Sequence, residues 1–113
     1  MHELSIAQSI IEIVTQDMPK HNLTKVDTIT LRIGEITQVM PDALLFGFEC
    51  LSKDTSLDGT KLIIETVPVK GHCKTCGQDF VFEDWPYGCP ECGQADIQII
   101  SGRELEIVEF EGS

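Results

Sequence analysis

Two cysteine pairs dominate the second half of the sequence, in the stretch CKTCGQDFVFEDWPYGCPECG at residues 73–93. A Cys-x-x-Cys pair can turn tightly and direct two thiolates at one ion, and the glycine that follows each pair permits the positive φ of such a turn. The twelve residues between the pairs, 77–88, are long enough for a short hairpin that brings the pairs together. The spacing therefore predicts a tetrahedral zinc site. Its four ligands would be Cys73, Cys76, Cys89 and Cys92.

Four thiolates fill the coordination shell of zinc and leave no position for water or substrate, so the predicted zinc is structural rather than catalytic. Residues 70–102 carry few apolar side chains, and we expect metal binding to drive their folding. Iron is the alternative ion for this spacing, as in rubredoxin-like electron carriers. His72, which directly precedes Cys73, is a candidate to tune the site.

The sequence before the cysteines alternates between helix and strand patterns. Apolar residues at helical spacing predict a helix from about Glu3 to Met18, and the alternation in TITLRI, residues 28–33, predicts a strand. Pro41 suits a first helical position and opens a second helix. We expect this helix to bury one face, formed by Leu44, Leu45, Phe48 and Leu51. Cys50 is expected to act as a small apolar residue.

Two further strands are predicted around the cysteine-rich segment. Residues 61–69, KLIIETVPV, are apolar on both faces and are therefore expected to be covered on both. Residues 102–110, GRELEIVEF, return to a strand pattern and would rejoin the first sheet. The fold class is therefore α+β, with a small mixed sheet packed by two helices and an inserted four-cysteine zinc ribbon. The predicted domains are residues 1–69 plus 103–113, and the inserted residues 70–102.

The composition narrows the possible partners and location. Eight basic and nineteen acidic residues give a net charge of −11, which disfavours nucleic acid and anionic membranes as partners. The longest apolar run is too short to cross a bilayer, and the start lacks the basic region of a signal peptide. We expect a cytoplasmic protein.

A second candidate metal site lies at the start of the chain, in MHE at residues 1–3. The Met1 amine, the His2 amide nitrogen and the His2 imidazole can form fused chelate rings, and Glu3 can add a carboxylate oxygen. Such a set of nitrogen and oxygen ligands suits nickel(II) or copper(II). An exposed, incomplete site can load and release its ion, unlike the four-cysteine site. His21 is assigned no role.

The sequence resembles the HypA/HybF hydrogenase maturation proteins along its whole length. The resemblance rests on MHELSIAQSI at residues 1–10, LRIGE followed by FGFE, and the two cysteine pairs before a final strand. It implies a nickel metallochaperone with His2 as the nickel imidazole, Met1 and Glu3 as neighbours, and zinc on the four cysteines. Some relatives have a histidine directly after the second cysteine pair, where this chain has Gly93.

The resemblance also implies partners. These are the GTPase HypB, the precursor of the large subunit of a nickel–iron hydrogenase and, for some members, urease maturation proteins. We therefore expect a carrier of Ni(II) and not an enzyme, because the sequence has no catalytic triad, phosphate loop or open zinc site. Two alternatives stay open at this point: a zinc-ribbon adaptor that only bridges proteins, and the rubredoxin-like electron carrier.

Overall fold

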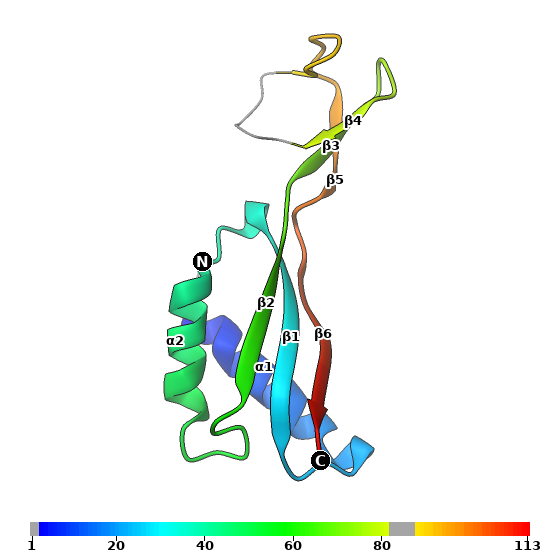
Figure 1. Ribbon diagram of the computed structural model, residues 1–113. Helices are drawn as coiled ribbons and strands as arrows, with labels where there is room; N and C mark the ends of the chain where they lie inside the picture. Colours follow the sequence, from blue (N-terminus) through cyan, green and yellow to red (C-terminus); the bar gives the residue numbers. More distant parts are fainter. Residues whose placement is uncertain (1–2, 82–87) are drawn as a thin grey trace.

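The chain forms two small sheets, with two helices packed against the first (Figure 1). The computed structural model describes residues 3–81 and 88–113. The molecule is elongated, 54 × 26 × 16 Å, with the helices at one end and the second sheet at the other. The elements are α1 (Glu3–Asp17), β1 (Val26–Gly34), α2 (Pro41–Ser52), β2 (Lys61–Val67), β3 (Lys70–Cys73), β4 (Asp79–Val81), β5 (Ile97–Ser101) and β6 (Leu105–Gly112), with single 3-10 turns at Pro19–His21 and Glu35–Thr37.

The first sheet has the strand order β2-β1-β6 and is mixed, as predicted. β1 runs parallel to β2, with Ile29 beside Leu62, and antiparallel to β6, with Ile29 beside Phe110. The parallel pair is possible because α2 crosses over between β1 and β2. The prediction that the last strand rejoins this sheet is confirmed, since β6 pairs with β1 along most of its length.

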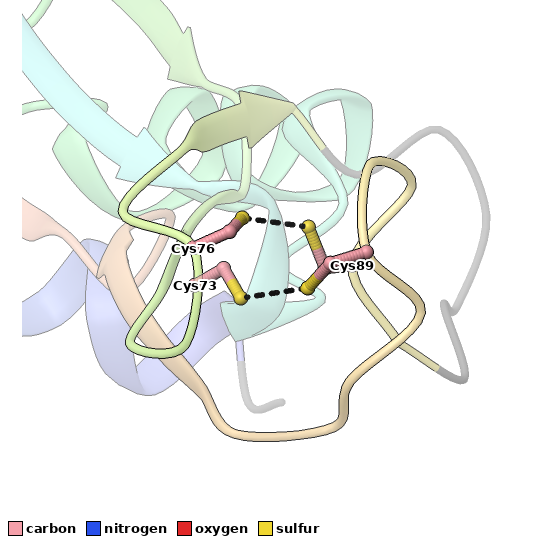
Figure 2. A group of neighbouring side chains, drawn as sticks. Cys73, Cys76 and Cys89 are labelled. Atoms are coloured by element: carbon pink, nitrogen blue, oxygen red, sulfur yellow. Dashed lines mark hydrogen bonds between the residues drawn. The ribbon is translucent and has the colours of Figure 1, made fainter.

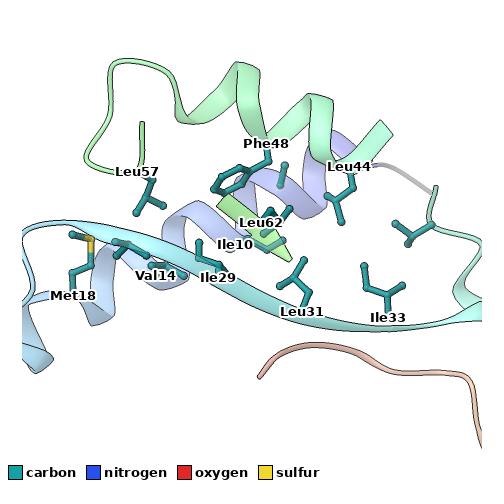
Figure 3. Close-up of a cluster of buried hydrophobic side chains, with 13 residues drawn as sticks. Ile10, Val14, Met18, Ile29, Leu31, Ile33, Leu44, Phe48, Leu57 and Leu62 are labelled. Atoms are coloured by element: carbon teal, nitrogen blue, oxygen red, sulfur yellow. The ribbon is translucent and has the colours of Figure 1, made fainter. Parts of the chain in front are cut away.

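The hydrophobic core lies between the first sheet and the two helices (Figure 3). α1 buries Ala7, Ile10 and Val14, which repeat every three or four residues and so share one helical face. This stripe packs against the alternating apolar residues of β1, so the helical and strand spacings in the sequence both place side chains in the same core. The β1 residues are Ile29, Leu31 and Ile33.

The buried face of α2 differs from the predicted one. Leu44 and Phe48 are buried as expected, but Leu45 and Leu51 are 39% and 40% exposed. Gly47 and Ser52 take the interior positions instead. The cause is the close approach of α1. A Cβ added to Gly47 would lie only 2.9 Å from Cδ2 of Leu4.

Two other expectations for this part of the chain are wrong. β2 is an edge strand with helices on one face only, and Ile63 is therefore 39% exposed on the opposite face instead of covered. Cys50 lies exposed on the outer side of α2 and is not a core residue. Both errors arise because an apolar side chain in the sequence does not reveal how many layers will cover it.

The second sheet, β4-β3-β5, is antiparallel and continues directly from the first. Two short connections join the sheets, one between β2 and β3 and one between β5 and β6. The Ser101 hydroxyl donates to the Pro68 carbonyl at 2.9 Å and ties the connections together. They also press against the end of β1, where a Cβ on Gly34 would lie 2.0 Å from the carbonyl carbon of Gly102.

Candidate metal centre

Four cysteine sulfurs converge at the far end of the second sheet (Figure 2). Cys73 ends β3 and Cys76 follows in the next turn, whereas Cys89 and Cys92 come from a turn in residues 88–96. All four Sγ atoms lie within 4.8 Å of one another. Cys73 and Cys89 are buried and Cys76 and Cys92 are exposed, so each pair gives the cluster one inner and one outer thiol.

The two turns have the same backbone geometry. In the first, the Gly77 N–H donates to the Cys73 carbonyl at 2.8 Å and the Cys73 N–H donates to the Gln78 carbonyl at 2.9 Å. In the second, Gly93, Cys89 and Gln94 repeat this pattern, with both distances at 2.8 Å. Each closing glycine has a positive φ, +80° for Gly77 and +77° for Gly93, as the sequence predicted.

The spacing of the sulfurs fits a tetrahedral ion. Cys73 Sγ lies 3.5 Å from Cys92 Sγ, and Cys76 Sγ lies 3.7 Å from Cys89 Sγ. Zinc–sulfur bonds of about 2.3 Å in a regular tetrahedron place the sulfurs about 3.8 Å apart. The cluster can therefore take a four-thiolate ion with little movement, and such an ion would have no open coordination position.

The electrostatics of the cluster also favour a cation. The backbone N–H groups of Cys76 and Thr75 point at the Cys73 sulfur and lower its pKa from 9.0 to about 6, with the Cys76 group the stronger influence. For Cys76 the Gln78 N–H acts in the same direction, but burial and the neighbouring thiols outweigh it and raise the pKa to about 12. Without an ion the cluster therefore ionises one thiol and resists ionising the next, and a bound cation would remove this conflict.

His72 does not join the cysteine cluster. Its Nδ1 lies 2.5 Å from an Asp79 carboxylate oxygen, and the two residues face each other in the β3–β4 pairing. This contact ties the strand that ends at Cys73 to its neighbour. His72 therefore supports the first cysteine turn from outside, and its partner Asp79 could not be identified from the sequence alone.

The N-terminal candidates are described only in part. Met1 and His2 lie outside the described residues, while Glu3 is the first residue of α1. The Glu3 carboxylate accepts a hydrogen bond from the Met40 N–H at 3.3 Å, just before α2 begins. Sequence reasoning did not find this contact, because the two residues are far apart in the chain.

His21, which was given no role, is exposed in the turn after α1 and meets the Phe110 ring edge-on, with ring centroids 5.9 Å apart. Among the described residues, no helix is long and apolar enough to cross a membrane.

Comparisons with known proteins identify the family to which the chain is similar. Residues 1–112 match the family described as "Hydrogenase/urease nickel incorporation, metallochaperone, hypA". The chain is 40% identical over 111 residues to the hydrogenase maturation factor HypA of Geobacter metallireducens, with 98% of each chain covered. It is 42% identical over 112 residues to that of Roseiflexus sp., covering 98% of this chain and 91% of the relative.

Two solved structures share the fold. The solution structure of the Ni metallochaperone HypA from Helicobacter pylori matches with a TM-score of 0.67 and 24% identity, over 99% of this chain and 97% of that one. A second structure, described as the solution structure of HypA protein, matches with a TM-score of 0.74 and 23% identity, over 100% and 97% of the two chains. By its full-length match and these relatives, the chain belongs to the HypA family of nickel-incorporation metallochaperones that mature hydrogenase and urease.

Proposed function

We propose that this chain binds Ni(II) at its N-terminus and delivers it to the precursor of a nickel enzyme, the large subunit of a nickel–iron hydrogenase. The observation that carries the proposal is the full-length family match, which includes the first residues of the chain. In this proposal the His2 imidazole is the main nickel ligand, and Met1 and Glu3 are its neighbours.

The closed geometry of the four-cysteine cluster is an argument for placing nickel at a different site. We assign zinc to Cys73, Cys76, Cys89 and Cys92, because the sulfur spacing suits a tetrahedral ion and a closed thiolate shell holds it tightly. An ion that must be handed over needs a site that can exchange ligands, and a closed shell offers no such position. The cargo ion therefore belongs elsewhere in the chain.

The position of Glu3 supports the N-terminal assignment. α1 begins at Glu3, and the first N–H groups of a helix have no partner within the helix. The His2 nitrogen can thus turn to a metal without breaking a helical hydrogen bond. The Glu3 carboxylate is already held near the start of α2 by the Met40 N–H, which limits the directions in which it can reach an ion.

The partners proposed with this function are the GTPase HypB, the hydrogenase precursor and urease maturation proteins, all in the cytoplasm. A negative surface suits protein partners with basic surfaces better than nucleic acid or membranes. The chain would act by carrying and releasing an ion, and not by catalysis.

The test is a nickel titration of untagged, zinc-loaded protein by calorimetry. His2→Ala is expected to abolish tight nickel binding while the zinc content and circular dichroism stay unchanged. His21→Ala is the matched control, because His21 is exposed and lies in the turn after the far end of α1. Equal nickel affinity in His2→Ala and the unchanged protein, or an equal loss in His21→Ala, would contradict the assigned site.

The pH dependence gives a second test of the same site. The ordinary pKa values of an imidazole and an α-amino group are about 6.5 and about 7.7, and protons on these groups compete with the metal. Nickel affinity should therefore rise from mildly acid to mildly alkaline pH, and a tag on the N-terminal amine should weaken it. A flat pH profile would argue against these ligands.

Metal analysis separates the proposal from an electron carrier. A colourless protein with zinc on its cysteines fits the proposal. A red protein that loses its colour on reduction would instead carry iron, which four thiolates also accept. A protein that holds zinc but binds no nickel in the titration would be an adaptor.

A further inference from the structure

β2 forms one edge of the first sheet, and β6 forms the other (Figure 1). β2 pairs with β1 over seven consecutive residue pairs without a shift of register. Outside this pairing, residues 61–67 make no backbone hydrogen bond to any other described residue. Leu62 is buried in the core, but Ile64 is only half-buried and Thr66 is exposed, so the helices do not close the outer side of β2. The strand therefore presents a regular row of free backbone groups.

The side chains of β2 on the open face of the sheet carry opposite charges on either side of an apolar residue. Because Leu62 points into the core, its neighbours in alternation, Lys61, Ile63 and Glu65, lie on the face without helices. In the part of the chain that the structure describes, neither Lys61 nor Glu65 has an ion pair. Arg32, which lies beside Glu65 in the β1–β2 pairing, is bonded instead to Glu106 at 3.3 Å. Both charges of β2 are thus available to a further strand.

We propose that β2 pairs antiparallel with β2 of a second copy of this chain, about a two-fold axis that passes through Ile63. In this register Lys61 of each copy faces Glu65 of the other, and the two Ile63 side chains face each other. Opposite charges and apolar residues directly across two strands stabilise their pairing. An axis at Leu62 or Ile64 would place Lys61 opposite an apolar residue instead, so the charges select one register.

The dimer would join the two sheets into one sheet with the strand order β6-β1-β2-β2-β1-β6. The strands of the two copies run in opposite directions, so the cysteine clusters would lie at opposite ends of the dimer and stay free. The inference goes beyond the proposed function, since it requires no nickel.

The other edge of the sheet does not suit a second copy. β6 carries Glu106, Glu109 and Glu111 on the open face and has no basic residue. Two copies of β6 would therefore place carboxylates close to carboxylates, which destabilises a strand pair. The pairing of β6 with β1 also shifts register between Thr30 and Leu31, and such a bulge makes an edge strand a poor template for a further strand. This contrast assigns the dimer contact to β2.

The net charge of −11 on each copy opposes association, but this repulsion is spread over the whole surface. It is screened beyond about 8 Å at physiological ionic strength. The contact at β2 is locally neutral, because each copy contributes one lysine and one glutamate to it. We therefore expect a reversible dimer that forms more readily when the salt concentration is raised from low to physiological.

The experiment measures the mass of the zinc-loaded, nickel-free protein by analytical ultracentrifugation, from micromolar to millimolar concentration. A reversible monomer–dimer equilibrium is expected. Lys61→Glu or Glu65→Lys alone would replace both opposite-charge pairs with like-charge pairs and should weaken the dimer by about tenfold or more. The combined variant, Lys61→Glu with Glu65→Lys, exchanges the signs and should restore the dimer. A protein that stays monomeric at every concentration would overturn the proposal.

Matched controls separate the contact at β2 from the effect of net charge. Lys20→Glu, in the turn after α1, changes the net charge by the same amount as Lys61→Glu, and Glu109→Lys, on β6, matches Glu65→Lys. Neither control should weaken the dimer as the β2 variants do. All these side chains are exposed, so circular dichroism should show an unchanged fold in every variant. Equal losses in controls and β2 variants, or no restoration in the combined variant, would overturn the proposal.

Amide hydrogen exchange locates the contact in the unchanged protein. Amides of β2 should exchange more slowly at high than at low protein concentration, because the second copy accepts hydrogen bonds from those that point away from β1. Amides of β6 should exchange at the same rate at both concentrations. Protection gained in β6, or in neither edge strand, would overturn the proposal. Loss of the dimer while His2-dependent nickel binding persists would refute this inference alone.

Discussion

The Glu3 carboxylate accepts a hydrogen bond from the Met40 N–H at 3.3 Å, and this contact joins the first residue of α1 to the residue that precedes α2. Beside this hydrogen bond, the Leu4 side chain of α1 packs over Gly47 of α2. The start of α1 is therefore held against α2 by one polar and one apolar contact. These contacts fix the position of the start of α1, to which the proposed nickel ligands are attached.

Substitutions at Glu3 separate its structural and metal roles. Glu3→Ala should lower the free energy of unfolding by about 1 kcal/mol, since it removes a hydrogen bond at a helix start. Glu3→Gln keeps an oxygen acceptor for Met40 and should restore most of this stability, as measured by urea denaturation. If the carboxylate ligates nickel, nickel affinity should fall in both variants. Full nickel affinity in Glu3→Gln would exclude the carboxylate as a ligand.

Removing the metal should affect the two sheets differently. We expect chelation to abolish amide-exchange protection in β3, β4 and β5, because these short strands have little apolar core. The helices and β1, β2 and β6 should keep most of their protection. This outcome tests the predicted division of the chain into two domains, residues 1–69 with 103–113 and residues 70–102. Simultaneous loss of protection in both sheets would contradict it. Cys50→Ser, which changes a thiol outside the cluster, should alter neither metal content nor protection.

The junction between the sheets should be intolerant of side chains. Gly34→Ala would place a Cβ 2.0 Å from the backbone of Gly102, so either β1 or the β5–β6 connection must move. We expect a loss of about 3 kcal/mol or more in the free energy of unfolding, measured with urea. Gly59→Ala is the control, because a Cβ there meets nothing within 4 Å and only its positive φ of +84° is strained. That variant should cost about 1 kcal/mol. Equal losses would show that the close approach does not matter.

Much of the fold follows from local patterns in the sequence. The periods of residues 3–18 and 28–33 identified α1 and β1, and Pro41 marked the start of α2. The cysteine spacing indicated the cluster, because the turn chemistry of Cys-x-x-Cys-Gly is local and determines where the sulfurs point. In each case the physical cause lies within a few residues of the feature.

The contacts between distant segments could not be predicted in this way. The exposure of Leu45, Ile63 and Cys50 depends on how the helices cross and on which face of the sheet they cover. The Glu3–Met40 contact and the Asp79 partner of His72 depend on the approach of elements that the sequence does not place.

The pairing of β6 with β1 sets the order in which a newly made chain can mature. β1 is completed early in synthesis, yet its second neighbour is residues 105–112, which are made after both cysteine turns. By then both cysteine turns have already emerged and can meet an ion. Loading of the cysteines can thus precede closure of the first sheet, and a chain halted before residue 105 would leave one edge of β1 without a partner strand.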